Sequence, residues 1–245
     1  MDETLWLSAV TPNQLLGYAR RELRATRTKA GRRKLRLFGC ACARRAWPVL
    51  RPEQQAIVEA AERAADGHAT LADVERAWAA TQQWTLPAVA GLFRTLIGRL
   101  LGRSQAVPTP APELPPQPPS VYTLLVLIAR REVWSAVGAG RAAAARDLNA
   151  VRGNKPAAEK RLQAELVRCL FGNPFRATPF DARWRTSTTV GLARAIYDEI
   201  AFDRLPILAD ALEEAGCDDE QLLRHCRESA VHARGCWVVD RVLGK

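Results

Sequence analysis

The sequence has no apolar run long enough to cross a membrane. A transmembrane helix needs about 20 predominantly apolar residues, whereas the longest run here, 121–129, is interrupted by Thr123 and followed at once by Arg130 and Arg131. The first residues, Met1-Asp2-Glu3, also lack the basic and apolar regions of a secretory signal peptide. We therefore expect a cytoplasmic protein that makes no membrane contact.

Cysteine and histidine are scarce in this chain. Six cysteines in 245 residues are too few for a disulfide scaffold, and a reducing compartment would keep them as thiols. In contrast, 48% of the residues are hydrophobic, and seven Trp, six Phe and three Tyr supply large side chains for a core. This composition excludes a wholly disordered chain.

Signatures of catalysis are also missing. The Gly-x-Gly at 138–140 lacks a third glycine and follows no predicted strand, so it does not indicate a phosphate loop. Glu199 and Asp203 have the i, i+4 spacing that places two carboxylates on one helical face. Carboxylates at this spacing are far more common in surface ion pairs than in catalytic pairs. His225 and Cys226 could be a base and a thiol nucleophile, but they are adjacent. Adjacent side chains on a helix diverge by about 100°, which argues against such a pair. We predict a non-enzymatic protein with no catalytic residue and no cofactor, a structural zinc ion being the alternative discussed below.

Hairpin turn signals such as Asn-Gly are absent, and apolar residues recur at helical spacing almost throughout. These patterns predict an all-α protein built from antiparallel helix pairs. Prolines or capping residues mark many of the expected helix starts, and glycines several of the ends. The expected helices cover approximately 11–23, 32–50, 52–66, 70–84, 120–151, 156–171, 188–204, 206–215, 218–228 and 236–243.

A proline-rich stretch divides the chain. Seven of the fifteen prolines lie between residues 107 and 119, and such a segment forms neither a helix nor a central strand, because proline lacks the amide donor. We interpret 103–119 as a semi-rigid linker. It would join an N-terminal helical unit, 1–102, to a C-terminal helical unit, 120–245. At the end of the helix 156–171, Gly172-Asn173-Pro174 predicts a stop in which Asn173 takes the left-handed conformation.

Positive charge is concentrated near the N-terminus. The formal net charge is +10, and residues 1–55 alone carry 12 Lys or Arg against 4 acids. Between Arg20 and Arg45 the single acid is Glu22. Such a segment is either a solvated arginine-rich surface or a binding face for nucleic acid or an acidic protein. The candidate contact residues for a polyanion are Arg20, Arg24, Arg27, Arg32, Arg33 and Arg36.

The last thirty residues hold a concentration of zinc-ligand side chains. Two of the three histidines and three of the six cysteines lie there, and zinc takes about four such donors in a tetrahedron. No established zinc spacing is matched, and the alternative is a hydrogen-bonded group packed around Trp237 and Val238. The predicted ligands are Cys217, Cys226, His232 and Cys236, with His225 as a substitute.

The other three cysteines fit a core better than a metal site. Cys40 and Cys42 are two positions apart on an expected helix, so their side chains point about 200° from each other and cannot share one metal there. Cys42 continues an apolar stripe, and Cys169 is flanked by Leu170 and other apolar residues. We therefore interpret Cys169, like Cys42, as a small core residue.

Several segments together resemble one family of small bacterial proteins that occur as many paralogues within a genome. The resemblance covers both halves of the chain and is weak in the middle, including the proline-rich stretch, and it implies no activity, cofactor or catalytic residue. The matching segments are Lys34-Leu-Arg-Leu-Phe38, Cys40-Ala-Cys42, Phe171-Gly-Asn-Pro-Phe175, Ala201-Phe-Asp-Arg-Leu-Pro-Ile-Leu-Ala-Asp-Ala-Leu212 and His232-Ala-Arg-Gly-Cys-Trp-Val-Val-Asp240.

Three functions remain open from the sequence. We favour a cytoplasmic helical module that binds a protein partner. The first alternative is nucleic-acid binding through Arg20–Arg45, and the second is a structural zinc site in the C-terminal region.

Overall fold

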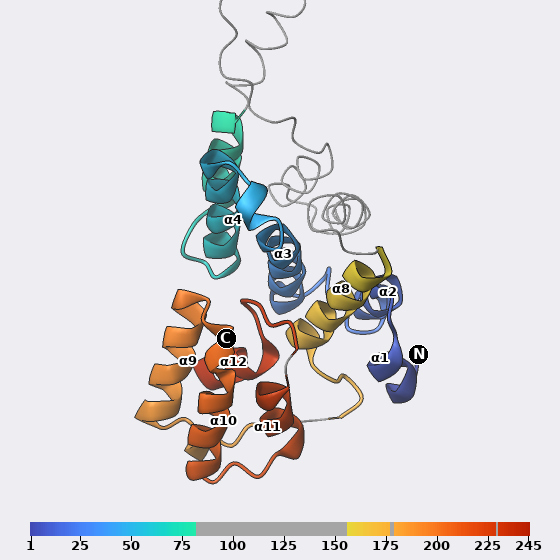
Figure 1. Cartoon of the computed structure of the whole chain (residues 1–245), viewed down its shortest axis with the longest axis vertical. Helices are drawn as coiled ribbons and strands as arrows, with labels where there is room; N and C mark the ends of the chain where they lie inside the picture. Colours follow the sequence, from blue (N-terminus) through green and yellow to red (C-terminus); the bar gives the residue numbers. More distant parts are fainter. Residues whose placement is uncertain (82–155, 177–178, 229) are drawn as a thin grey trace, which may run out of the picture.

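A computed structural model describes residues 1–81, 156–176, 179–228 and 230–245. All regular elements in these ranges are helices, which confirms the predicted all-α class (Figure 1). The α-helices are α1 (Glu3–Ser8), α2 (Pro12–Arg21), α3 (Lys29–Arg44), α4 (Pro52–Ala65), α8 (Pro156–Phe171), α9 (Ser187–Glu199), α10 (Leu205–Glu214), α11 (Glu220–Arg227) and α12 (Trp237–Leu243). Residues 71–81 are also helical, and 3-10 turns lie at Trp47–Val49, Ala182–Trp184 and Phe202–Arg204.

Side-chain caps define several of the helix starts. Thr28 accepts a hydrogen bond from the Gly31 backbone N–H at the start of α3, and Asp219 accepts one from Leu222 at the start of α11. Each such cap satisfies an amide that the helix itself leaves unpaired, and it is worth about 1 kcal/mol. The predicted pairing of Thr70 with Asp73 is present, with Asp73 accepting from the Thr70 amide at 2.6 Å.

The described helices bury two hydrophobic clusters. The first lies among α1–α4 and α8 and includes Trp6, Leu35, Phe38 and Ile57. The second lies among α9–α12 and includes Ile196, Tyr197, Leu212, Trp237 and Val238. In Figure 1 the orange and red helices α9–α12 lie together below α3 and α4, with yellow α8 between α2 and the lower group.

Helix α8 faces both clusters. Leu166, Val167 and Leu170 belong to the first cluster, whereas Cys169 belongs to the second. The two directions follow from the helical repeat, because positions 167 and 169 are about 200° apart. The predicted linker 103–119 and the predicted helix 120–151 lie outside the described residues.

Two backbone positions require glycine. A Cβ on Gly31 would lie 2.4 Å from the Ala25 Cα, so α3 and the turn before it meet without room for a side chain. Gly235 has φ +86°, and a Cβ there would lie 2.7 Å from Leu37 and 2.9 Å from Leu170. Gly235 therefore lets the segment before α12 lie against both α3 and α8.

Two predicted helix ends differ in the structure. The helix predicted over 188–204 ends at Glu199, because Ile200 takes a left-handed conformation with φ 58°. At the end of α8 the left-handed residue is Gly172, with φ +69°, and not Asn173. Glycine adopts this conformation without a Cβ clash, which leaves Asn173 free to accept from the Phe175 amide at 3.0 Å.

A buried polar network joins the two parts of the fold. Arg33 of α3 donates to Asp66 at 2.9 Å, to Asp240 of α12 at 2.6 Å and to the Tyr197 hydroxyl of α9 at 2.8 Å. Tyr197 in turn donates to Asp66 at 2.7 Å. Both carboxylates have side chains only 4% exposed, and buried charges of this kind persist when they are paired and hydrogen-bonded.

Among the described helices, we find none with the length and apolarity that spanning a bilayer requires.

Candidate metal centre

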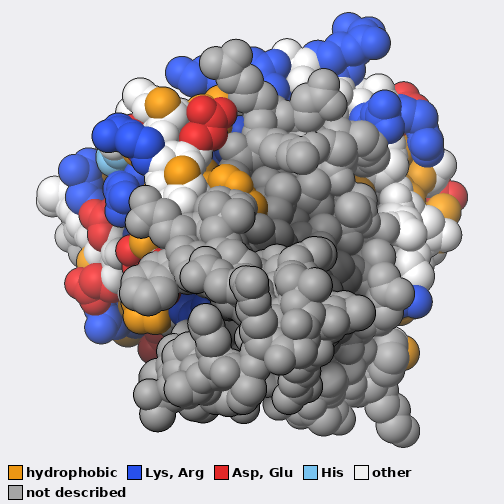
Figure 2. Space-filling model, turned by 90° about the horizontal axis from the view of Figure 1, so that it is seen from above, with side chains coloured by type: hydrophobic (Ala, Val, Ile, Leu, Met, Phe, Trp, Pro, Cys, Tyr) orange, Lys and Arg blue, Asp and Glu red, His pale blue; other side chains and the backbone are white. Residues whose placement is uncertain are grey.

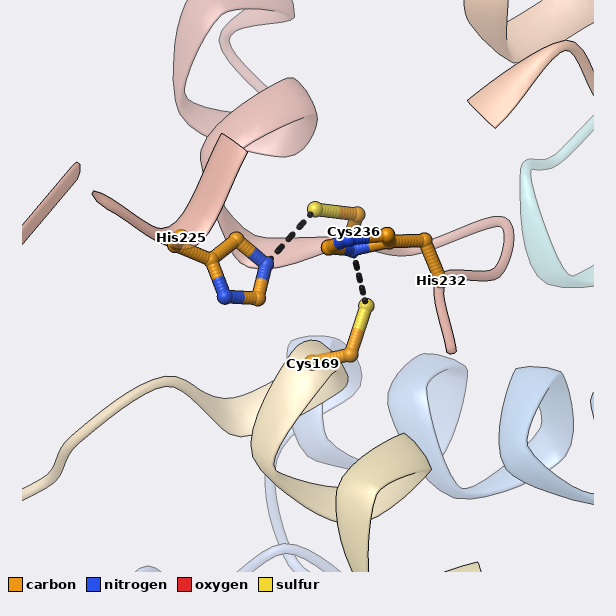
Figure 3. A group of neighbouring side chains, drawn as sticks. All are labelled: Cys169, His225, His232 and Cys236. Atoms are coloured by element: carbon orange, nitrogen blue, oxygen red, sulfur yellow. Dashed lines mark hydrogen bonds between the residues drawn. The ribbon is translucent and has the colours of Figure 1, made fainter. Parts of the chain in front are cut away.

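Four soft side chains meet where α8, α11 and the segment before α12 converge. Figure 3 shows Cys169 on α8, His225 near the end of α11, and His232 and Cys236 on the segment that leads to α12. One donor atom from each residue lies within 4.8 Å of the donor atoms of the other three. We call these four residues the Cys/His group.

The local structure explains how residues distant in sequence converge. Helix α11 ends at Arg227 and α12 starts at Trp237, and residues 230–236 form no helix before it. His232 and Cys236 lie on that segment, and Gly235 allows it to lie against α8. Cys169 reaches the group from α8. Its side chain points away from Val167, which packs in the first cluster, and therefore toward the second cluster.

Two of the separations between the donor atoms match those of one tetrahedral ion. His225 Nε2 lies 3.3 Å from Cys236 Sγ, and His232 Nδ1 lies 3.6 Å from Cys169 Sγ (Figure 3). In a tetrahedral zinc site, bonds of about 2.3 Å to sulfur and 2.0–2.1 Å to nitrogen place neighbouring ligand atoms about 3.3–3.8 Å apart. The two observed contacts fall within that interval. Two thiolates and two imidazoles form a donor set that zinc prefers.

The outer ring nitrogen of His232 has a partner suited to a metal ligand. Its Nε2 lies 3.4 Å from the backbone carbonyl of Glu228. A histidine that binds metal through one nitrogen usually donates its other N–H to a carbonyl or carboxylate, which fixes the tautomer and the ring orientation. If Nε2–H donates to Glu228, the Nδ1 lone pair faces Cys169 and the centre of the group.

Aromatic rings hold the two histidines in place. The His225 and His232 rings meet edge to face, with centroids 4.9 Å apart and an interplanar angle of 88°. The His225 ring also lies 5.4 Å from the Trp237 ring. Both histidines are half-buried, whereas Cys169 is 1% and Cys236 0% exposed. The sulfur ligands are therefore shielded from water more completely than the nitrogen ligands.

The two thiols of the group influence each other's ionisation. The pKa of Cys169 is raised well above its ordinary value, because its thiol hydrogen-bonds to Cys236 and because it is buried. Burial opposes ionisation of Cys236 as well, but hydrogen bonds from Cys169, His225 and His232 and the charge of His225 lower the pKa of the Cys236 thiol well below its ordinary value. These interactions favour ionisation of Cys236 over ionisation of Cys169.

The structure brings together some of the predicted zinc ligands and not others. His232, Cys236 and the substitute His225 lie in the Cys/His group, but Cys217 and Cys226 do not. Those two cysteines are buried in the second hydrophobic cluster, which also contains Trp237 and Val238. Sequence reasoning did not select Cys169, because its apolar neighbours suggested a purely structural role.

A signal for Cys169 was nevertheless present. Leu166, Val167 and Leu170 define one apolar face of α8, and Cys169 lies off that face by the helical repeat. A cysteine on the other side of a buried helix is therefore a candidate contact for a second group of helices. The sequence does not show which residues Cys169 contacts, since its partner His232 follows 63 positions later.

The predicted basic face is divided between surface and interior. Arg20, Arg24, Arg27 and Arg32 are exposed, whereas Arg33 and Arg36 are half-buried. Acids from distant elements pair with several cations of the segment 20–45: Asp66 and Asp240 with Arg33, Glu62 with Arg44, and Glu159 with Arg45. In Figure 2, Lys and Arg side chains on the visible described surface are interspersed with acidic and apolar ones.

Comparisons with family models, with curated proteins and with solved structures find no match to this chain.

Proposed function

We propose that this protein binds one structural zinc ion through Cys169, His225, His232 and Cys236. The observation that carries the proposal is the convergence of two sulfur and two nitrogen donors within 4.8 Å of one another. Four protein ligands fill a tetrahedral coordination sphere and leave no position for a substrate. The site would serve the fold, in a helical protein that acts by binding a partner and not by catalysis.

The position of the group indicates what the ion would do. Cys169 belongs to α8, which packs mainly with the N-terminal helices, whereas the other three ligands belong to the C-terminal part of the chain. A shared ion would hold α8 against the C-terminal helices. It would be a second link between the two parts of the fold, beside the Arg33 network. Because ligands from an unfolded chain do not meet, the free energy of metal binding contributes to the free energy of folding.

Metal analysis of the purified chain tests this proposal, and the sequence supplies a matched control. We expect about one equivalent of zinc in the full-length protein. Cys169→Ala should lose most of it, whereas Cys226→Ala should retain it. Both side chains are 1% exposed, so each substitution removes one buried sulfur, but only Cys169 lies in the group.

The same pair of variants separates metal binding from general loss of stability. Thermal unfolding with and without a strong chelator should differ for the unsubstituted protein and for Cys226→Ala, and should coincide for Cys169→Ala. Zinc content equal in the two variants, or absent from the unsubstituted protein after refolding with zinc, would refute the proposal.

A second candidate function is polyanion binding by the exposed arginines around the turn between α2 and α3. Arg20, Arg24, Arg27 and Arg32 are exposed there, and Glu22 is the acid within the same stretch. Phosphate contacts of this kind produce affinity that falls steeply with salt and shows little sequence preference. Replacing Arg24 and Arg27 with Glu should abolish retardation of DNA or RNA at low salt, and a lack of retardation by the unsubstituted protein would eliminate this candidate.

A further inference from the structure

A pocket opens beside the Cys/His group. Its volume is about 580 Å³, and its lining includes Trp6, Arg168, Cys169, His225, Glu228 and Trp237. Of the two cysteines in the group, Cys169 lines the pocket and Cys236 does not. Cys169 is therefore the cysteine of the group that a small molecule in the pocket would meet first, although its side chain is only 1% exposed.

The two sulfurs of the group are close enough to react with each other. Cys169 Sγ and Cys236 Sγ lie within 4.8 Å, and a disulfide requires an S–S distance of about 2.05 Å. Cys236 lies on the segment between α11 and α12, just before the first residue of α12. Rotation of the two side chains, with a small shift of that segment, could close the remaining gap.

The geometry points to a redox switch in which hydrogen peroxide converts the zinc-bound pair Cys169 and Cys236 into a disulfide and releases the ion. This inference rests on the proposed zinc site. Metal binding keeps both sulfurs as thiolates, and the thiolate is the form that reacts with peroxide. Access through the pocket selects Cys169 for attack, and proximity selects Cys236 as the resolving residue.

The chemistry balances in two steps. The Cys169 sulfur attacks one peroxide oxygen, the O–O bond breaks, and the departing hydroxide takes a proton to become water, which leaves a sulfenic acid on Cys169. The Cys236 sulfur then displaces hydroxide from that sulfenic acid, forming the S–S bond and, with a second proton, a second water. The two thiolates lose two electrons in total, and peroxide gains them. Zinc retains only two imidazole ligands and dissociates.

The remaining cysteines are poorly placed for this reaction. All six cysteines are buried, but none of the other four, Cys40, Cys42, Cys217 and Cys226, lines the pocket. Burial raises the pKa of Cys40 well above its ordinary value and also raises the pKa of Cys226. Neither belongs to the proposed zinc site, which would hold Cys169 as a thiolate, so both should remain protonated and slow to react at neutral pH.

The experiment begins with the full-length, zinc-loaded protein. Zinc content is measured first, hydrogen peroxide is then added in steps, and released zinc is followed with a chromogenic chelator. Disulfides are mapped by mass spectrometry of an unreduced digest. We expect one zinc released for each Cys169–Cys236 disulfide formed, and recovery of zinc binding after treatment with a reductant and zinc. Cys226→Ala should behave identically.

A second pair of variants tests the route of attack. Gln221 lines the pocket, whereas the neighbouring Glu220 is exposed and does not. Gln221→Trp should slow zinc release by peroxide several-fold without changing zinc content, and Glu220→Trp should leave the rate unchanged. Equal rates in the two variants would overturn the pocket as the route.

The outcomes separate the two proposals. A protein that holds no zinc before peroxide is added overturns the zinc site, and this inference with it. A protein that holds zinc but retains it while other thiols are oxidised, or that forms a disulfide between other cysteines, overturns the redox switch and leaves the zinc site standing.

Discussion

Replacing Arg33 with Met should destabilise this protein more than most single substitutions. The guanidinium lies between Asp66 and Asp240, at 2.9 Å and 2.6 Å, and all three side chains are at most 13% exposed. Methionine has a similar length but no charge, so the substitution leaves the buried Asp240 without its cation and Asp66 with only Lys245, at 3.3 Å. Tyr197 also loses the hydrogen bond that it accepts from Arg33.

The magnitude follows from two opposing effects. At a separation near 3 Å and an effective dielectric constant of about 20, each ion pair contributes about 5 kcal/mol of attraction. The cost of removing the charges from water offsets much of this attraction, and breaking a buried pair typically costs about 3–5 kcal/mol. If the free energy of unfolding falls by about 2 kcal/mol for each molar of urea, the urea concentration at the unfolding midpoint should fall by about 2 M.

Urea unfolding followed by circular dichroism measures this change, with Arg32→Met as the control. Arg32 is exposed and donates to backbone carbonyls of the preceding turn, so its loss should cost less than about 1 kcal/mol. Adding Asp240→Asn to Arg33→Met should recover part of the lost stability, because it removes the buried charge that Arg33→Met leaves without a cation. Equal midpoints for Arg32→Met and Arg33→Met would show that the network does not stabilise the fold as argued.

Three further results are expected. Gly31→Ala should cost about 1–3 kcal/mol, because its Cβ would lie 2.4 Å from the Ala25 backbone, whereas the control Gly191→Ala, with open space around it, should raise the thermal midpoint slightly. Burial and a hydrogen bond to Asp66 raise the pKa of Tyr197, so its contribution to stability is complete below pH ~10 and lost at higher pH; Tyr197→Phe should flatten the alkaline limb of a stability–pH profile, and an unchanged limb would contradict the assignment. Acidification from pH ~7 to ~5 should release zinc from the Cys/His group, because protons compete for thiolates and imidazoles; zinc retained at pH 5 on dialysis would be the contrary result.

Much of the helical architecture could be predicted, because its signals are local. Proline near the start of α10 and the Thr70–Asp73 cap act within a single turn, and the structure contains both. Helix ends were less predictable. Ile200 takes a left-handed conformation that a β-branched residue disfavours, so a signal based on residue preference could not locate that end.

The candidate site could be predicted only in part, for a physical reason. His225, His232 and Cys236 lie close together in the sequence, and their crowding indicated soft-metal chemistry. Cys169 joins them only because α8 packs between two clusters, and such packing is a property of the whole fold. The charge run 20–45 shows the same effect, since its neutralising acid Glu159 lies 114 positions away from Arg45.

The shared position of α8 has a consequence for the order in which the chain can fold during synthesis. Leu166, Val167 and Leu170 complete the cluster formed by α1–α4, but the ribosome makes them only after residues 66–165 have followed α4. The N-terminal helices therefore leave the ribosome with an uncovered apolar surface, and during that interval they are the part of the chain most exposed to aggregation or to capture by a chaperone. The length of the intervening chain matters little to the final stability, because doubling the length of a closing loop costs only about 0.6 kcal/mol. It does determine the time between the synthesis of α4 and the synthesis of α8.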